Sequence, residues 1–193
     1  MGPPVLHLAS SSPRRREILE ALGLTFTCAG VDIDESRRDG EAVDEMAMRL
    51  AREKAMAADP ADHDGLPVLA ADTIVVLGDR VFGKPASEAD ALSMLQALSG
   101  TTHRVLTAIN VRAGDTTIAA MSDTAVRFRD ISPDEAAAYW QSGEPRDKAG
   151  AYAIQGLGGI FVAAIEGSYS GVVGLPVFET ADLLAKAGIR ILE

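Results

Sequence analysis

The sequence contains little cysteine, no excess of basic residues and no long apolar run. Cys28 is the only cysteine among the 193 residues, which excludes an intrachain disulfide framework and a zinc site built from several cysteines. We expect this lone thiol to be buried as a small apolar side chain. Eighteen Lys and Arg against 28 Asp and Glu give a net charge of −10. Non-specific affinity for nucleic acids requires basic side chains that neutralise phosphates, so we expect no stable nucleic-acid partner.

Two further absences concern the membrane and secretion. No apolar run reaches the roughly 18 residues that a membrane-spanning helix needs. The first eight residues lack the basic segment and the long apolar segment of a signal peptide. We therefore expect no membrane partner and a cytoplasmic location.

The composition is that of an ordered domain. Hydrophobic residues make up 47% of the chain and charged residues 24%, which is enough apolar material to bury a core. The length predicts a single domain over residues 1–193, or a compact unit of two lobes. Strand-like segments at 5–9, 68–71, 74–77, 104–112, 117–128 and 160–165 alternate with helix-like segments that begin near 13, 43, 88, 133 and 176, and 60–65 is a polar loop. This alternation predicts an α/β fold with a mixed sheet and helices packed around it.

Several common motifs are incomplete or do not occur. Residues 78–84 fit the phosphate-loop pattern G-x-x-x-x-G-K, but Pro85 follows where that motif has Ser or Thr. Gly78 and Asp79, between two β-rich segments, are instead typical of a hairpin turn. The sequence contains neither a G-x-S-x-G nucleophile elbow nor a G-x-G-x-x-G fingerprint. The three histidines lack metal-ligand spacing, so we interpret them as packing or surface residues.

The segment at residues 8–16 joins a strand, a serine-rich turn and a helix whose first turn carries three arginines. Ser12 can cap this helix, and Pro13 suits its first position. Cations at a helix N-terminus oppose the macrodipole. The arrangement becomes favourable when backbone N–H groups, hydroxyls and guanidinium groups hold an anion there. The alternative is a capped surface helix with solvated arginines.

Acidic residues offer a second kind of chemistry. Asp72 interrupts an apolar segment at the end of a predicted strand, where an unpaired charge is costly. It could hold a divalent cation or accept a proton from water, or it could belong to an ordinary strand-end turn. The acidic stretch at 32–35 contains the carboxylates that Mg²⁺ binds, although alone it is typical of a solvated loop. Lys54 and Lys84 could contact phosphate, and each is also typical of a surface lysine.

The segment at residues 147–159 is rich in glycine and alanine. Small side chains leave room for a flat group, and Gln155 offers both a donor and an acceptor for the edge of a nucleotide base. A purely structural glycine turn is the competing interpretation.

Taken together, these segments resemble the Maf family of nucleoside triphosphate pyrophosphatases. The resemblance runs from about residue 8 to residue 176. Its motifs are Ser-Ser-Ser-Pro-Arg-Arg at 10–15, Asp-Glu at 34–35, Leu-Ala-Arg-Glu-Lys-Ala at 50–55, Ala-Asp-Thr at 71–73, Gly-Lys-Pro at 83–85, Gly-Thr-Thr-His at 100–103, Asp-Lys-Ala-Gly-Ala-Tyr at 147–152 and Val-Val-Gly-Leu-Pro at 172–176. The resemblance implies a mixed twisted sheet with flanking helices, two lobes with a central cleft, an architecture related to that of inosine triphosphate pyrophosphatase, and a homodimer.

Within the family, the segments around Thr73 and Gln155 resemble the branch that acts on dTTP and UTP. The resemblance implies cleavage between the α- and β-phosphates, with Asp72 as the proton acceptor and Arg14, Thr73 and Gln155 as specificity positions. It also implies that Glu35 and Asp72 hold Mg²⁺ or Mn²⁺. The positions that match phosphate-binding residues are Ser10, Arg15, Lys54, Lys84 and Lys148.

Two other functions remain open from the sequence. One is a pyrophosphatase of the same family that acts on 7-methyl-GTP. The other is a non-catalytic nucleotide-binding regulator of cell division. The set of Asp72, Glu35 and lysines favours an enzyme, because binding alone does not require an acid at the end of a strand.

Overall fold

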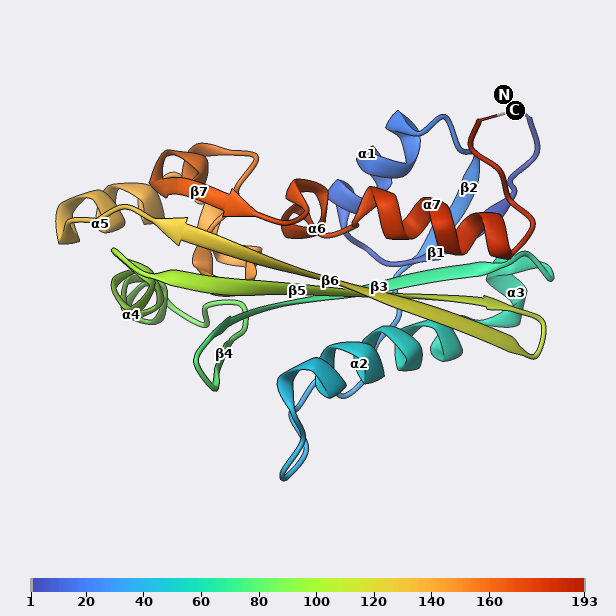
Figure 1. The fold of residues 1–193 in the computed structure, drawn as a ribbon, viewed down its shortest axis with the longest axis horizontal. Coiled ribbons are helices and arrows are strands. Elements are labelled where there is room, and N and C mark those ends of the chain that lie inside the picture. The colour runs from blue at the N-terminus through green and yellow to red at the C-terminus, as the bar shows by residue number, and fades with distance from the viewer. Residues whose placement is uncertain (1, 193) are drawn as a thin grey trace. The chain divides into compact units, whose positions relative to one another are not determined.

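Figure 1 shows a computed structural model of the chain, which describes residues 2–192. The strands are β1 (Leu6–Ala9), β2 (Phe26–Ala29), β3 (Val68–Leu77), β4 (Arg80–Phe82), β5 (Thr102–Ala113), β6 (Thr116–Phe128) and β7 (Val162–Glu166). The α-helices are α1 (Pro13–Ala21), α2 (Val43–Ala57), α3 (Pro60–His63), α4 (Glu88–Leu98), α5 (Pro133–Gln141), α6 (Tyr169–Val173) and α7 (Val177–Lys186), and the 3-10 turns are η1 (Glu144–Asp147), η2 (Ala149–Ala151) and η3 (Leu157–Phe161). Within residues 2–192, no helix combines the length and the hydrophobicity required to span a membrane.

The strands of the described residues form one seven-stranded sheet in the order β2-β1-β3-β5-β6-β7, with β4 paired to β3. Strand β1 runs parallel to both β2 and β3. In contrast, β4 is antiparallel to β3, and β7 is antiparallel to β6. The predicted α/β fold with a mixed sheet and helices around it is therefore confirmed.

The chain divides into two compact units. The first contains the residues up to Asp72, Thr107–Ser122 and the residues from Gly174 on. The second contains Thr73–Leu106 and Asp123–Val173. The boundary between the units therefore falls inside β3, β5 and β6. The single domain over residues 1–193 and the cleft between two lobes stay predictions.

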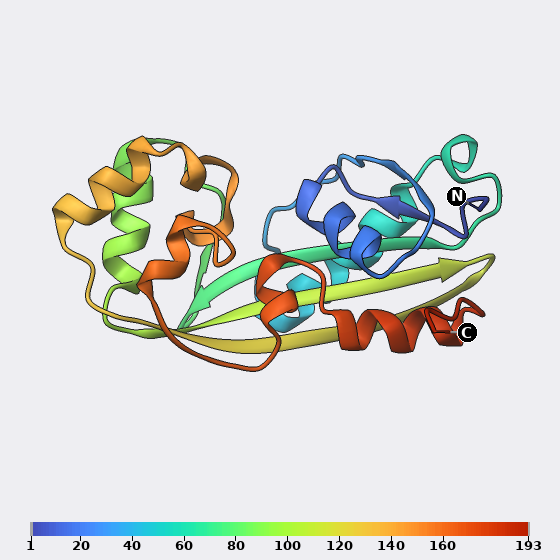
Figure 2. The same ribbon diagram turned by 90° about the horizontal axis from the view of Figure 1, so that it is seen from above.

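In the first unit, helices cover both faces of the strands (Figures 1 and 2). On one face, Leu69 of β3 packs with Leu19 of α1 and with α7. On the other face, Ala70 packs with Ala55 of α2. Side chains alternate between the two faces of a strand, so Asp72 lies on the same face as Ala70, the one that α2 covers.

Strand β3 is continuous from Val68 to Leu77, whereas the sequence predicts two strands interrupted at residues 72–73. That prediction was wrong because Asp72 forms an ion pair with Lys54 inside the fold. The strand therefore carries no unpaired buried carboxylate. Asp72 lies within a strand that has β1 and β5 as its neighbours, and not at a strand end.

Two other local predictions were also wrong. Residues 60–65 include the short helix α3, because the side chain of Asp59 accepts the N–H of Ala61 and Pro60 occupies the first turn. Strand β2 was not predicted, and Cys28 within it is exposed rather than buried. This exposure follows from the place of β2 at the end of the strand order, where β1 is its sheet neighbour.

The turn between β3 and β4 agrees with the sequence. Leu77 pairs with Arg80 across the two-residue turn formed by Gly78 and Asp79. Gly78 has a φ of 60°, in the left-handed region that glycine enters without strain. The predicted hairpin is confirmed, and residues 78–84 do not form a phosphate loop.

The core of the second unit lies between α4, α5 and the strands, and it includes the fully buried Phe161. Helix α4 is capped by Ser87, whose side chain accepts the N–H of Asp90. Helix α5 begins with a capping box formed by Ser132 and Glu135. Both helices start as the sequence predicts.

A buried histidine makes this core sensitive to acid. The ring Nε2 of His103 lies 2.9 Å from the hydroxyl of Tyr152, and Nδ1 has no hydrogen-bond partner among the described residues. Burial lowers the pKa of His103 to about 4. In the unfolded chain, the His103 imidazole is protonated below about pH 6.5, whereas in the folded protein it stays neutral until the pH approaches 4. The free energy of unfolding therefore falls as the pH decreases from about 6.5 towards 4, and His103 does not affect it above that range.

We expect His103→Gln to reduce this loss. Between pH 7 and pH 4.5, the free energy of unfolding should fall by on the order of 2 kcal/mol less in the variant than in the parent. Urea denaturation of both proteins at the two pH values measures the difference. Burial also lowers the pKa of His7. Because His7 is present in both proteins, its contribution cancels in the comparison. Equal losses in both proteins would contradict the assignment.

Candidate functional site

The candidate site begins where β1 ends. Strand β1 pairs with β3 up to Leu8 and Leu69, and the chain then turns at Ser10 while β3 continues. The hydroxyl of Ser10 accepts the backbone N–H of Ser12 at 3.2 Å and a guanidinium N–H of Arg15 at 3.1 Å. The serine-rich turn identified in the sequence is thus organised around the buried hydroxyl of Ser10.

Helix α1 starts at Pro13 as predicted, and Ser12 occupies the cap position, but the Ser12 side chain makes no capping hydrogen bond. Arg15 folds back from the first turn of this helix. Its Nε donates to the carbonyl oxygen of Gly174 at 2.8 Å, in addition to the bond with Ser10. A guanidinium held in this way loses little conformational freedom when it binds an anion.

Charged side chains of both signs surround Arg15. Burial lowers the pKa of the Arg15 guanidinium, the carboxylates of Asp72 and Glu35 oppose this change, and the charge of Arg14 adds to it. These four side chains therefore belong to one electrostatic neighbourhood in the first unit. Two cations beside two carboxylates can accommodate both a phosphate and a metal ion.

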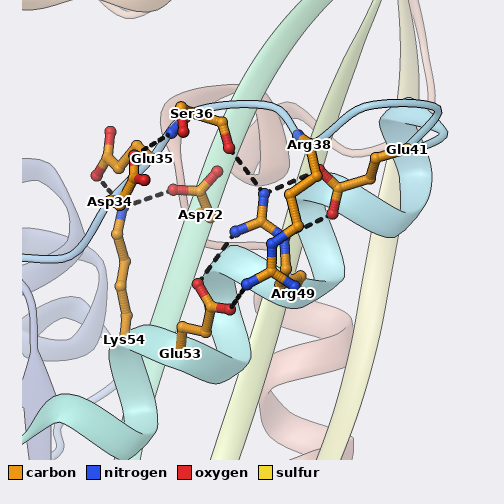
Figure 3. A network of polar contacts seen from close by, with 9 residues as sticks. All are labelled: Asp34, Glu35, Ser36, Arg38, Glu41, Arg49, Glu53, Lys54 and Asp72. Carbon is orange, nitrogen blue, oxygen red and sulfur yellow. Dashed lines mark hydrogen bonds and ion pairs between the residues drawn. The ribbon is translucent and has the colours of Figure 1, made fainter.

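The ammonium of Lys54 lies between two carboxylates (Figure 3). Its Nζ is 2.6 Å from Oδ1 of Asp72 and 2.6 Å from Oε1 of Glu35. The side chains of Lys54 and Asp72 are only 12% and 7% exposed, whereas that of Glu35 is 56% exposed. Three of the predicted residues, from three separate segments, thus meet at one nitrogen atom.

Lys54 reaches Asp72 because of its place on α2. Leu50, Ala51 and Ala55 of this helix are buried. Residues three and four apart share a helix face, so Lys54 extends from the same side as Leu50 and Ala51. Its long aliphatic stem allows the ammonium to leave the apolar face and reach the carboxylates.

The two carboxylates fit a divalent cation. Oxygen atoms are the preferred ligands of Mg²⁺, which commonly binds one or two carboxylates together with substrate phosphates. Oxygen atoms of Asp72 and Glu35 converge on the same point, since both lie 2.6 Å from one nitrogen. In the described part of the chain, no three His, Cys, Asp or Glu side chains are grouped to hold a metal.

Lys84 and Lys148 belong to the second unit. Lys84 is exposed and follows β4, and the carbonyl oxygen of Gly83 accepts the N–H of Gly150 at 3.1 Å. This bond holds the Lys84 turn beside η2. Lys148 directly precedes η2 and pairs with Asp147. The two lysine-bearing segments are therefore neighbours within this unit.

Thr73 and Gln155 also belong to the second unit. Thr73 lies on the same face of β3 as Val75, opposite to that of Asp72, because side chains alternate along a strand. Val75 packs against Gly150, where an added Cβ would lie 3.0 Å from its Cγ1. Thr73 is therefore on the strand face against which the glycine-rich segment packs. Gln155 is exposed in the turn of this segment, after the buried residues 151–154.

Two residues outside the predicted site, Tyr139 and Glu144, shape the turn that carries Gln155. The carboxylate of Glu144 accepts the hydroxyl of Tyr139 at 2.6 Å and the backbone N–H groups of residues 157–158 at 3.0 and 2.9 Å. The Tyr139 hydroxyl in turn accepts the N–H of Ala153 at 3.0 Å. These bonds fix the backbone on both sides of Gln155. An isolated Glu in a polar segment gives no sequence signal for such a role.

The comparisons with known proteins agree with the resemblance seen in the motifs. The sequence model of the Maf-like protein family matches residues 5–187. The chain therefore belongs to the Maf family, and the family prediction is confirmed. A dTTP/UTP pyrophosphatase of Methylococcus capsulatus is 51% identical over 184 residues, which cover 95% of this chain and 91% of that protein. A dTTP/UTP pyrophosphatase of Hahella chejuensis is 51% identical over 188 residues, which cover 96% of this chain and 94% of that protein.

Among solved structures, this chain is similar to that of the Staphylococcus aureus Ham1 protein. The match covers 64% of this chain and 71% of the Ham1 chain. The TM-score is 0.43 and the sequence identity is 16%.

Proposed function

We propose that this protein is a nucleoside triphosphate pyrophosphatase that hydrolyses dTTP and UTP to the monophosphate and pyrophosphate. The observation that carries the proposal is the Lys54 ammonium, which lies 2.6 Å from carboxylate oxygens of both Asp72 and Glu35. An acid, a lysine and a fixed guanidinium are the groups that a reaction at phosphorus uses. Relatives about 50% identical over nearly the whole chain are named dTTP/UTP pyrophosphatases, which supports this choice of substrates.

Cationic side chains are proposed to bind the triphosphate. The chain has a net charge of −10, so a local cluster of cations is needed to offset its repulsion of a polyanionic substrate. Fixed guanidinium groups bind phosphate oxygens in pairs, whereas lysines act as point charges. The proposed contacts are Ser10, Arg14, Arg15, Lys54, Lys84 and Lys148.

Asp72 is the proposed proton acceptor. Its carboxylate takes a proton from water while the water oxygen bonds to the α-phosphorus. The bond from that phosphorus to the oxygen bridging to the β-phosphate breaks, and pyrophosphate leaves with the bonding electrons. The Lys54 ammonium, which forms an ion pair with the Asp72 carboxylate, can stabilise the negative charge that develops on the phosphate oxygens.

Glu35 and Asp72 are the residues that would hold Mg²⁺ or Mn²⁺. When bound, such an ion neutralises phosphate charge and makes a coordinated water more acidic. Glu35 is 56% exposed, so it can receive an ion that arrives from solvent with the substrate. Lys54 forms ion pairs with both carboxylates, and its positive charge limits their mutual repulsion before the ion binds.

Arg14, Thr73 and Gln155 are proposed to select the base. Thymine and uracil present one N–H donor between two carbonyl acceptors. The amide of Gln155 has both a donor and an acceptor to meet this pattern. A base with another pattern leaves buried polar groups unpaired, which lowers its kcat/KM. The bonds of Glu144 to residues 157–158 support this selection because they keep the turn in one shape.

A panel of triphosphates tests the proposed function. With Mg²⁺ present, kcat/KM for dTTP and for UTP should exceed that for 7-methyl-GTP and dCTP by at least about tenfold. Efficient hydrolysis of 7-methyl-GTP with little turnover of dTTP or UTP would contradict the substrate assignment. Release of no pyrophosphate from any triphosphate would support a nucleotide-binding regulator instead.

The homodimer implied by the family resemblance and the cytoplasmic location predicted from the sequence are part of the same proposal. Neither is needed for the chemistry described above.

A further inference from the structure

The loop between β2 and α2, which carries Glu35, contains no strand and no α-helix. Such a loop keeps one shape only when other bonds hold its backbone. The correct position of Glu35 matters, because its carboxylate must reach the nitrogen of Lys54. Several of the bonds that hold the loop are made by one residue of α2, Arg49 (Figure 3).

The guanidinium of Arg49 donates to four acceptor atoms on three residues. Nε donates to Oε1 of Glu41 at 2.5 Å, and Nη2 donates to Oε2 of Glu41 at 2.8 Å. Nη2 also donates to the carbonyl oxygen of Ser36 at 3.0 Å, and Nη1 donates to Oε2 of Glu53 at 3.1 Å. Arg49 therefore ties the residue after Glu35 and the far end of the loop to the helix that presents Lys54.

Neighbouring bonds reinforce this attachment. Oε2 of Glu41 also accepts the backbone N–H of Arg38 at 3.1 Å, and the Arg38 side chain donates to Glu53 at 2.8 Å. The side chains of Arg49 and Glu41 are only 13% and 9% exposed. The hydrogen bonds from Arg49 hold the pKa of Glu41 at about 2, so this carboxylate is ionised at neutral pH. The side chain of Asp34, the residue before Glu35, accepts the backbone N–H of Ser36 at 2.9 Å, which is a further bond within the loop.

A lysine could not replace this arginine. The planar guanidinium donates in fixed directions to both oxygens of Glu41 and to the carbonyl of Ser36. A lysine ammonium is a single point charge and cannot satisfy these acceptors together. The contacts therefore require the shape of the guanidinium as well as its charge.

We propose that Arg49 is a positioning residue, which holds residues 36–41 on α2 and thereby places Glu35 against Lys54 and Asp72. Arg49 and Lys54 belong to the same helix, so one rigid element fixes the loop carboxylate and the lysine relative to each other. The structural part of the inference stands on the contacts alone, and its kinetic consequence rests on the proposed function.

A double-mutant cycle tests the proposal. Arg49→Lys should lower kcat/KM for dTTP by about 10- to 100-fold and raise the Mg²⁺ concentration needed for half-maximal rate. In the Glu35→Gln background, the same change should cost less than about threefold, because its effect passes through Glu35. Arg52→Lys, on the exposed side of the same helix, is the matched control and should leave kcat/KM unchanged. Equal losses in both backgrounds would overturn the proposal.

Hydrogen exchange tests the positioning role of Arg49 independently of the proposed pyrophosphatase activity. Exchange at residues 34–41 should be faster in Arg49→Lys than in the parent and in Arg52→Lys, whether or not the protein hydrolyses dTTP. Unchanged exchange refutes the positioning role, whereas a parent protein without pyrophosphate release refutes the proposed function alone. If Arg49→Lys does not fold, Glu41→Gln keeps the guanidinium and removes the charge that Nε and Nη2 bind. It should show the same dependence on Glu35 and the same faster exchange, and the absence of both would overturn the proposal.

Discussion

Asp72→Asn should lower kcat for dTTP by at least about 10³-fold while the protein stays folded. An amide cannot accept a proton from water at neutral pH, and the loss of a general base alone costs about 10²- to 10⁴-fold. Asparagine has nearly the shape of aspartate, and Lys54 keeps Glu35 as a partner, so we expect β3 to be preserved. Steady-state rates of pyrophosphate release and circular dichroism of both proteins provide the comparison.

The control for this variant is Asp115→Asn. Asp115 is an exposed acid in the turn between β5 and β6 of the same unit, and its substitution removes the same charge at a residue outside the proposed site. Asp115→Asn should turn over at the parent rate. An Asp72→Asn protein that also turns over at the parent rate would show that Asp72 is not the proton acceptor.

Lys54→Met should affect both activity and stability. Removal of one partner of a buried ion pair leaves the other charge unpaired, which costs about 3–5 kcal/mol. Asp72 also interacts with Arg15, so we expect the lower end of this range, about 3 kcal/mol. The loss of a cation beside the reacting phosphate should lower kcat by about 10²- to 10³-fold. Urea denaturation and pyrophosphate release measure the two effects.

Lys186→Met is the matched control for stability. Lys186 pairs with Asp182 at 2.6 Å on the surface of α7, with both side chains more than half exposed. An exposed pair of this kind contributes less than about 1 kcal/mol. The double variant Lys54→Met with Asp72→Asn should regain part of the stability lost in Lys54→Met, because the carboxylate that Lys54 neutralises is then absent as well. A Lys54→Met protein as stable as Lys186→Met would contradict the buried ion pair.

Local chemistry made much of the fold predictable. Helices α4 and α5 start where Ser87 and Ser132 supply a capping side chain, and these signals lie within a few residues of each other in the sequence. Strand β3 was not predicted correctly, because the ion pair that allows Asp72 to lie within it comes from Lys54 on another element. Such long-range pairing leaves no trace in the pattern of one segment.

The same distinction between local signals and long-range contacts applies to the candidate site. Asp72, Lys54 and Glu35 could be selected from the sequence because they lie in motifs that resemble those of the Maf family. Each also has a side chain that suits phosphate or metal chemistry. Arg49 and Glu144 could not, because they act through bonds to neighbouring backbone and side chains. Their role depends on loop shape, which becomes known only once the helices and turns are in place.

The products formed from dTTP in ¹⁸O-labelled water, followed by phosphorus NMR with Mg²⁺ present, test the central claim most directly. Attack of water on the α-phosphorus predicts equal amounts of labelled dTMP and unlabelled pyrophosphate. Formation of dTDP and inorganic phosphate, or incorporation of the label into pyrophosphate, would contradict the account.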